Sequence, residues 1–291
     1  MVRPNVKPII IAGPTGSGKS ALALKWAKKY GGEIICADSR QFYQHMHIGT
    51  ASPSKKECEE VPHHGFNCVD PSTTKVDAGY FVAFAKKTIN EIQERGMRPI
   101  IVGGTGLYLR ALRYGTGDVP KSNPQIVQEL EEECDRIGLD KLYQELIRID
   151  KNSAEFIRAQ DRYRIIRALE IYRQTGKAPS KIRQSFYEKK TQLKARWIMK
   201  FCVRDKLLEK LKSRVERMFD EGLLNEAKAL RNIVGVEHWA LNVMGYHEAL
   251  LVIDNKISLE EAQERVFIRH RQYSKQQTTW FKKEQFYRWH I

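Results

Sequence analysis

The sequence predicts an α/β fold in which a parallel sheet carries helices on both of its faces. Its first third alternates short apolar runs, at residues 9–12, 33–36 and 99–102, with helical patterns at residues 19–30 and 79–95. Alternation of this kind is typical of parallel sheets whose two faces are both covered. Each apolar run ends in glycine or polar residues, and ligands of such sheets bind beyond the carboxyl ends of the strands. We therefore expect a ligand site at that edge.

The first expected strand leads into the most informative segment of the chain, Gly13-Pro14-Thr15-Gly16-Ser17-Gly18-Lys19-Ser20. This is the pattern G-x-x-x-x-G-K-[ST] between a strand and a helix, which indicates a P-loop NTPase-like core. Glycines let consecutive backbone N–H groups point at one anion, and the helix start and Lys19 add positive charge. Ser20 offers a hydroxyl to a Mg²⁺ ion that bridges phosphate oxygens. The loop predicts a di- or triphosphate ligand and leaves its identity open.

The rest of the chain divides into a helical segment and a return to the core. The other expected elements are helices at 125–137, 155–175, 206–234 and 258–284 and a strand at 197–203. Residues 118–195 contain no convincing strand run, so we expect an inserted all-helical domain there. Residues 1–117 and 196–291 are predicted to form one catalytic core together.

Basic residues gather in the second half of the expected insertion. From Glu155 to Arg183 there are eight Lys and Arg residues against three acidic ones. Arg158 and Arg162 lie four residues apart, and Arg164 and Arg167 three apart, so each pair can share a helix face. Basic groups bind phosphates, which predicts a nucleic acid as partner of this domain. The alternative is a charged helix face that is merely solvated.

The overall composition also favours a polyanionic partner. The 291 residues carry 50 Lys and Arg against 35 Asp and Glu, a formal net charge of +15 at pH 7. Such a charge favours a polyanionic partner, and the alternative is an enzyme that is basic without binding one. No apolar run approaches the roughly 18 residues of a membrane span, and no signal peptide precedes the first strand. The five cysteines form no C-x-x-C pair. We expect a monomer in the cytoplasm, with no membrane association and no zinc module.

The residues after the other two strands determine which chemistry the phosphate loop serves. A hydrolytic NTPase normally has an acidic residue at the end of a further apolar strand. Here the strand at 99–102 ends in Gly103-Gly104-Thr105, and the acid follows the second strand instead, as Asp38. A carboxylate there would face the phosphate loop and accept a proton from an attacking nucleophile, whereas Thr105 can donate to a phosphate oxygen. The alternative for Asp38 is a turn former or helix N-cap.

His63 and His64 are the one pair of adjacent histidines that could suggest a metal site. Adjacent side chains point in different directions, and no third ligand follows at a recognisable spacing. We therefore expect a structural or loop role for this pair, and Ser20 is the only residue that we assign to a metal, through its hydroxyl and a phosphate-bound Mg²⁺.

An ordered set of motifs resembles the tRNA dimethylallyltransferases of bacterial type. The set comprises the phosphate loop, Asp38-Ser39-Arg40-Gln41 with Ile48-Gly49-Thr50-Ala51, Gly103-Gly104-Thr105-Gly106-Leu107-Tyr108, the 164–175 stretch with Arg167-Ala168-Leu169-Glu170, and Gln272-Tyr273-Ser274-Lys275-Gln276-Gln277-Thr278-Thr279-Trp280-Phe281. The phosphate loop alone is generic, but the ordered set is specific and runs nearly from end to end of the chain.

The resemblance implies transfer of the five-carbon unit of dimethylallyl pyrophosphate to the exocyclic N6 amine of the adenosine on the 3′ side of the anticodon. The phosphate loop would then hold the pyrophosphate leaving group instead of ATP. Asp38 would take the proton from the adenine amine, and Lys19, Thr105 and Mg²⁺ would stabilise charge on the departing pyrophosphate. Arg214 matches the position of an arginine that contacts pyrophosphate in the family.

The resemblance further implies contacts with the anticodon stem-loop, whose target base is extruded before the chemistry. The matching positions are Asp38, Ser39, Arg40, Gln41, Thr105, Arg164, Arg167, Asn242, Gly245, Tyr246 and His247. The chain departs from the usual pattern of the family at Val127, Asp150-Lys151, Ala159-Gln160-Asp161 and Lys275-Gln276-Gln277. Two other functions remain open: prenyl transfer to a free adenine nucleotide, and a P-loop small-molecule kinase.

Overall fold

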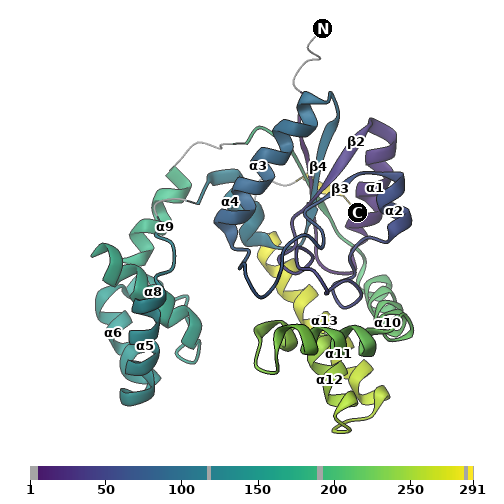
Figure 1. Ribbon diagram of the computed structural model, residues 1–291. Coiled ribbons are helices and arrows are strands. Elements are labelled where there is room, and N and C mark those ends of the chain that lie inside the picture. The colour runs from purple at the N-terminus through teal and green to yellow at the C-terminus, as the bar shows by residue number, and fades with distance from the viewer. Residues whose placement is uncertain (1–5, 117–118, 189–192, 285–287, 291) are drawn as a thin grey trace. The chain divides into compact units, whose positions relative to one another are not determined.

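A computed structural model describes residues 6–116, 119–188, 193–284 and 288–290 (Figure 1). The strands are β1 (Ile9–Ala12), β2 (Gly32–Cys36), β3 (His63–His64), β4 (Arg98–Gly103), β5 (Arg196–Lys200) and β6 (Arg288–His290). The helices are α1 (Lys19–Tyr30), α2 (Lys55–Glu60), α3 (Ala78–Glu94), α4 (Gly106–Tyr114), α5 (Pro124–Ile137), α6 (Leu139–Ile149), α7 (Lys151–Ala154), α8 (Arg162–Thr175), α9 (Pro179–Glu188), α10 (Arg204–Asp220), α11 (Leu223–Val234), the 3₁₀ helix η1 (Trp239–Asn242), α12 (Tyr246–Ile253) and α13 (Leu259–Lys282).

The strands form one parallel sheet in the order β3-β2-β4-β1-β5-β6, which confirms the predicted fold class. Strand β1 lies inside the sheet, where Ile10 pairs with Ile101 of β4 and with Trp197 of β5. All of its residues are buried, as expected for a strand that is covered on both faces. Because the strands are parallel, the loops after β1, β2 and β4 meet at the same edge of the sheet.

Helices α1 and α3 cover opposite faces of the sheet (Figure 1). Alternate strand residues such as Ile9 and Ile11 pack with Ala23 and Ala27 of α1 in one buried cluster. Helix α3 begins after Asp77, whose side chain accepts a hydrogen bond from the Tyr80 backbone N–H at 2.7 Å. Such an N-cap satisfies one of the free donors at a helix start. These packed layers hold the phosphate loop rigidly at the end of β1.

Two of the expected helices differ from those in the structure. The expected helix at 206–234 is two helices, α10 and α11, because Gly222 interrupts the pattern with a φ of 101° that favours glycine. The helix expected from residue 155 begins only at Arg162, where the Asp161 side chain caps the backbone N–H of Arg164 at 3.2 Å. Arg158 therefore lies in the preceding turn and shares no helix face with Arg162, contrary to our expectation.

Other elements were absent from the sequence-based prediction. They are α2, α4, α6, α7, α9, η1 and α12 and the short strands β3 and β6. Strands of two or three residues carry too little periodicity to be recognised, and several of these helices are short enough to resemble loops. None of the helices in the described part of the chain is both long and apolar enough to cross a membrane.

The chain divides into two compact units, Met1–Ala111 with Lys194–Ile291, and Leu112–Leu193. We call them the core unit and the insertion unit. The first expected boundary, at 117/118, falls on residues outside the described ranges. The second boundary lies between Leu193 and Lys194, two residues before the expected position at 195/196. The insertion unit has its own buried apolar cluster, built from α5, α6 and α8 around residues such as Leu130, Leu146 and Leu169. This cluster lets the insertion unit fold around a separate centre.

Candidate active site

The phosphate loop lies between β1 and α1 and is shaped by its glycines. Gly16 and Gly18 have φ angles of 83° and 84°, which residues with a side chain rarely adopt. Between them Ser17 is fully buried, and its backbone N–H donates to the Pro14 carbonyl at 3.2 Å. The loop leads directly into the first turn of α1, where free backbone N–H groups and the helix dipole favour an anion.

Lys19 and Ser20 begin α1 and both line a cavity of about 610 Å³ in the core unit. The Lys19 Nζ donates to the Pro14 carbonyl at 3.4 Å. Burial lowers the pKa of Lys19 to about 8, and the nearby Arg214 cation adds to this effect. A bound polyphosphate would compensate this unfavourable burial of charge. Ser20 is exposed at the cavity, where its hydroxyl is available to a ligand.

Asp38 and Thr105 follow β2 and β4, and the structure links their two loops. The Ser39 backbone N–H donates to Thr105 Oγ1 at 2.9 Å, and the Thr105 N–H donates to the Ala37 carbonyl at 3.3 Å. Asp38 Oδ1 accepts the Arg40 N–H at 2.9 Å. The carboxylate therefore also shapes a turn, which is the alternative role that the sequence allowed for Asp38. Gly103, at the end of β4, lies so close to the backbone after β2 that a Cβ at this position would be 2.0 Å from the Ala37 oxygen. Only glycine therefore fits here.

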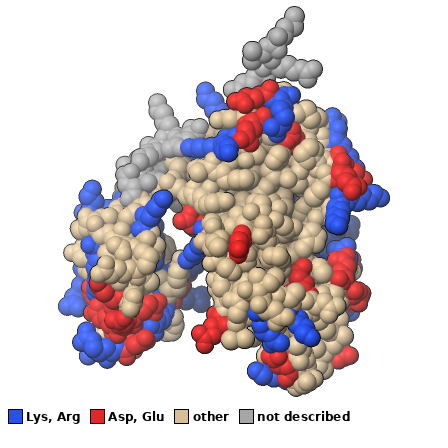
Figure 2. All heavy atoms as spheres, in the orientation of Figure 1, with Lys and Arg blue, Asp and Glu red and all other residues tan. Residues whose placement is uncertain are grey.

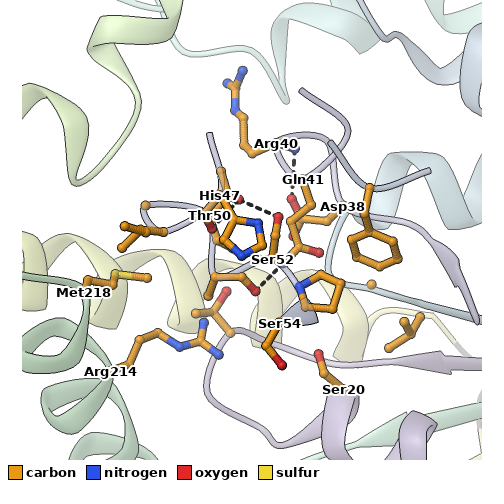
Figure 3. A pocket seen from close by; sticks show the side chains of 18 of the residues that line it. Ser20, Asp38, Arg40, Gln41, His47, Thr50, Ser52, Ser54, Arg214 and Met218 are labelled. Atoms are coloured by element: carbon orange, nitrogen blue, oxygen red, sulfur yellow. Dashed lines mark hydrogen bonds between the residues drawn. The ribbon is translucent and has the colours of Figure 1, made fainter. Parts of the chain in front are cut away.

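Arg214 reaches the same cavity from α10, far along the sequence from the phosphate loop. Figure 3 shows its side chain among those of Ser20, Asp38 and Met218. Burial and the neighbouring Arg217 lower the pKa of Arg214, whereas the Asp38 carboxylate opposes the shift. Lys19, Arg214 and Asp38 therefore influence one another electrostatically within one cavity. The two cations can neutralise an anionic ligand that binds in this cavity.

Helix α13 contributes two cavity residues to which the sequence analysis gave no role, His270 and Tyr273. Burial lowers the pKa of His270 to about 4, so its ring is neutral at pH 7, and its Nδ1 lies 3.0 Å from the Val266 carbonyl. Burial and then the Asp38 charge raise the pKa of Tyr273 to about 12. The resemblance of the closing helix covered Tyr273, but no spacing in the sequence places either residue beside the phosphate loop.

The cavity wall opposite the phosphate loop contains Arg40 and Gln41. Gln41 points inward, and its Nε2 donates to the carbonyls of Thr50 and Ala51 at 3.0 and 2.9 Å. Its amide therefore supports the wall. Arg40 is exposed and its guanidinium lies 5.1 Å from the centre of the Trp239 ring. Figure 3 shows the Arg40 side chain directed away from the other labelled residues. Arg40 therefore faces solvent, whereas Gln41 does not.

The residues from Asn242 to His247 differ in their exposure. Asn242 and His247 are exposed and can meet a partner. Tyr246 is fully buried, and its hydroxyl donates to Glu226 at 2.6 Å. Gly245 is buried as well, and its N–H donates to Glu248 at 2.8 Å. The side chain of Tyr246 therefore has no exposed surface in this structure, and the expected tRNA contact at this position stays a prediction.

The four arginines of α8 form ion pairs within the insertion unit. Arg162 pairs with Glu131 and Asp135 of α5, and Arg173 pairs with Glu133 of the same helix. Acidic side chains gather over α5 on the face shown in Figure 2. Residues 112–193 carry 16 Lys and Arg against 13 Asp and Glu, so 12 of the 15 net positive charges belong to the core unit. Two of the eight basic residues in the 155–183 cluster, Arg162 and Arg173, thus have acidic partners on the neighbouring helix α5.

Arg164 and Arg167 have different surroundings on α8. The side chain of Arg164 is 66% exposed and pairs with Asp161 at 2.9 Å. Arg167 is more buried, pairs with the buried Glu170 at 2.5 Å, and donates to the Pro120 carbonyl at 2.6 Å. The exposed guanidinium of Arg164 is accessible to a phosphate, whereas Arg167 is held by partners within the insertion unit.

Among the described residues, no group of three or more His, Cys, Asp and Glu could hold a metal ion. His63 and His64 form β3, where His64 Nε2 lies 2.6 Å from Glu33 and His63 Nδ1 lies 2.7 Å from the Val61 carbonyl. Both contacts are structural.

Two family models match the chain. One, described as IPP transferase, matches residues 41–284, and another, described as isopentenyl transferase, matches residues 6–64. The tRNA dimethylallyltransferase of Anaeromyxobacter dehalogenans strain 2CP-1 is 39% identical over 282 residues, covering 97% of this chain and 92% of that protein. The tRNA dimethylallyltransferase of Geobacter sulfurreducens is 38% identical over 284 residues, covering 97% and 91%.

Two solved structures of transferases that act on tRNA are also similar to this chain. The tRNA delta(2)-isopentenylpyrophosphate transferase of Staphylococcus epidermidis is 36% identical, with a TM-score of 0.68 and coverage of 98% of this chain and 93% of that one. A eukaryotic dimethylallyltransferase acting on tRNA is 33% identical, with a TM-score of 0.79 and coverage of 95% and 70%. The similarity therefore extends over both units of the chain.

Proposed function

This chain belongs to the tRNA dimethylallyltransferase family, and we propose that it transfers the dimethylallyl group of dimethylallyl pyrophosphate to the N6 amine of the adenosine on the 3′ side of the anticodon. One observation carries the proposal: a single cavity combines a phosphate loop and Arg214 with the Asp38 carboxylate. Cations for a leaving group and an acceptor for a proton are the two requirements of this reaction.

The phosphate side of the cavity suits the leaving group. As the allylic carbon–oxygen bond breaks, its electron pair moves to pyrophosphate, which gains negative charge. Lys19 and Arg214 line the cavity there, and their lowered pKa values show that their charges are incompletely solvated. Cations held in place stabilise such charge without reorganising solvent. We propose that Thr105, whose oxygen accepts the Ser39 N–H, donates its own proton to a phosphate oxygen.

Asp38 is the proposed general base. The adenine N6 forms the new bond to the allylic carbon with its lone pair, and one of its protons must leave. The Arg40 N–H holds Asp38 Oδ1 at 2.9 Å, which orients the carboxylate so that Oδ2 can take this proton. In the sequence the acid follows β2, not β4, which suits an organic nucleophile better than the water of an NTPase.

The residues present fit a Mg²⁺ ion that arrives with the substrate. Ser20 would hold it through its exposed hydroxyl, and the pyrophosphate oxygens would supply most other ligands. When bound, the ion would neutralise charge on the leaving group. Lys19 and Arg214 act on the same charge from the protein side.

For tRNA, we propose that the exposed members of the matching set make the contacts and the buried members position them. The exposed members are Arg40, Arg164, Asn242 and His247, and the more buried ones are Asp38, Ser39, Gln41, Thr105, Arg167, Gly245 and Tyr246. Since 12 net positive charges belong to the core unit, we propose that this unit provides most of the long-range attraction for RNA. We further propose that the chain acts as a monomer on cytoplasmic tRNA.

The experiment is transfer of label from dimethylallyl pyrophosphate, with Mg²⁺, to unmodified tRNA and to AMP in parallel reactions. We expect label in tRNA only. Label in AMP would replace the proposal with prenylation of a free nucleotide. Label in neither, together with rapid turnover of ATP, would mean that the phosphate loop serves a kinase or NTPase.

A further inference from the structure

One wall of the cavity is a loop whose backbone conformation requires support from outside. Residues 45–51, called the wall loop below, contribute His47, Ile48, Gly49, Thr50 and Ala51 to the cavity lining. Figure 3 shows the side chains of His47 and Thr50 among those that line the cavity. The loop is bounded by two non-glycine residues with positive φ, His45 at 63° and Ala51 at 52°. Such conformations persist only where neighbouring groups impose them.

The main support is the carboxylate of Glu226, which lies in the first turn of α11. It accepts hydrogen bonds from three consecutive backbone N–H groups, those of His47 at 3.0 Å, Ile48 at 2.9 Å and Gly49 at 3.0 Å. Consecutive N–H groups that converge in this way form an anion-binding concavity. Here an anion from the protein itself occupies it.

Tyr246 of α12 supports the wall loop together with Glu226, and we call these two residues the clamp. Its hydroxyl donates to Glu226 Oε1 at 2.6 Å, and its ring lies against Gly49, where a Cβ would be only 2.4 Å from Tyr246 Cε2. Burial raises the pKa of Tyr246 well above its usual value, so the hydroxyl remains a donor throughout the working range of pH. The wall loop is therefore held by charge at its N–H groups and by contact at Gly49.

We propose that Glu226 is a positioning residue for the transfer reaction, which acts by holding the wall loop in the shape that orients the substrates. The clamp lies on α11 and α12, and Glu226 does not line the cavity. Its loss should therefore disturb the alignment of the reacting groups while the phosphate loop still binds its ligand. Misplacement by about 1 Å can cost about 10²-fold in rate. This inference rests on the proposed function.

The first test is Glu226→Gln, because an amide keeps the volume but directs an NH₂ group toward backbone donors. We expect kcat/KM for dimethylallyl transfer to fall by about 10- to 100-fold, with the Kd of inorganic pyrophosphate within twofold of the wild type. The matched control is Glu216→Gln, the same exchange at an exposed position of α10, which should change neither quantity. A transfer rate within twofold of wild type in Glu226→Gln would overturn the proposal.

The second test disturbs the clamp at another atom. Gly49→Ala places a Cβ against the Tyr246 ring, so it should reproduce the same loss of transfer with pyrophosphate binding retained. Hydrogen exchange of the 45–51 amides should accelerate in both variants and not in Glu216→Gln. Unchanged exchange, or an equal loss of pyrophosphate binding, would contradict the positioning role. A wild-type protein that transfers no label would instead refute the proposed function, while the exchange result would still test the clamp.

Discussion

Gln277 of α13 accepts the backbone N–H of Thr15 in the phosphate loop, with 2.8 Å between Thr15 N and Gln277 Oε1, although 262 positions separate the two residues. The Nε2 of the same side chain donates to the Gly104 carbonyl at 2.9 Å, and Ser274 Oγ donates to the Thr15 carbonyl at 3.0 Å. The last helix therefore joins the loops after β1 and β4. Lys19 follows the first of these loops and Thr105 lies in the second, so one buried amide links the two segments that position them.

Replacing this amide should destabilise the core unit and weaken the anion site. Gln277→Met keeps the length of the side chain but leaves the Thr15 N–H and the Gly104 carbonyl buried without partners, at a cost of about 1–3 kcal/mol for each group. Urea unfolding should show the loss, and pyrophosphate titration should show a higher Kd. Gln276→Met, one residue earlier and exposed, is the control and should change stability by less than about 0.5 kcal/mol. Equal effects of the two variants would contradict the linking role.

Asp38→Asn separates the two roles of Asp38. The amide oxygen can still accept the Arg40 N–H and preserve the turn, but the side chain no longer takes a proton at neutral pH. We expect kcat for transfer to fall about 10²- to 10⁴-fold, the usual effect of losing a general base, with the Kd for tRNA nearly unchanged. Asp38→Ala should show at least the same loss of transfer. Near-normal turnover in Asp38→Asn would exclude the carboxylate as the base.

Pyrophosphate affinity should depend on pH through Lys19. The pKa of Lys19 in the ligand-free protein is lowered to about 8, mainly by burial and then by Arg214. Binding of an anion favours the protonated lysine, so the Kd should rise as pH increases through about 8 and this charge is lost. Lys19→Arg remains charged over this range and should show a flatter profile. Identical slopes for the two proteins would assign the pH dependence to the ligand alone.

Acid should destabilise the core unit through His270. Burial lowers the pKa of this histidine to about 4, below its usual 6.5, so the unfolded chain binds a proton in a range where the folded protein does not. Stability should therefore decrease as pH falls from about 6.5 to 4, by an amount on the order of 3 kcal/mol. In His270→Gln the free energy of unfolding should vary less over this interval. An unchanged pH profile in the variant would show that other groups cause the acid effect.

Arg164 and Arg167 should give different phenotypes despite their shared helix. Arg164→Ala removes an exposed cation, so the insertion unit should keep its stability, while tRNA affinity falls and its salt dependence decreases by about one phosphate contact. Arg167→Ala leaves the buried Glu170 without its cation and should destabilise the insertion unit by about 1–3 kcal/mol. Thermal unfolding and tRNA titration at several salt concentrations distinguish these effects. A stable Arg167→Ala variant with a reduced salt slope would assign RNA binding to Arg167 instead.

The phosphate loop shows why part of the site could be predicted. Gly13 to Ser20 require a strand before them and a helix after them, and the structure has β1 and α1 at the expected bounds. Asp38 and Thr105 were recognised because parallel strands place their carboxyl ends at one edge. Arg214 was identified only through the family resemblance, since a single arginine on a long amphipathic helix has no local signal that distinguishes it from a surface residue.

The sequence alone was sufficient for the fold class, the phosphate loop and the family, because each depends on local pattern and order along the chain. Only the tertiary structure showed that α5 pairs with Arg162 and Arg173 of α8, that Tyr246 is buried, and that Glu226 and Gln277 hold the loops of the cavity. These relationships join residues far apart in sequence. They depend on which surfaces pack together, and charge pairing and burial are properties of that packing, so no periodicity or spacing in the chain encodes them separately.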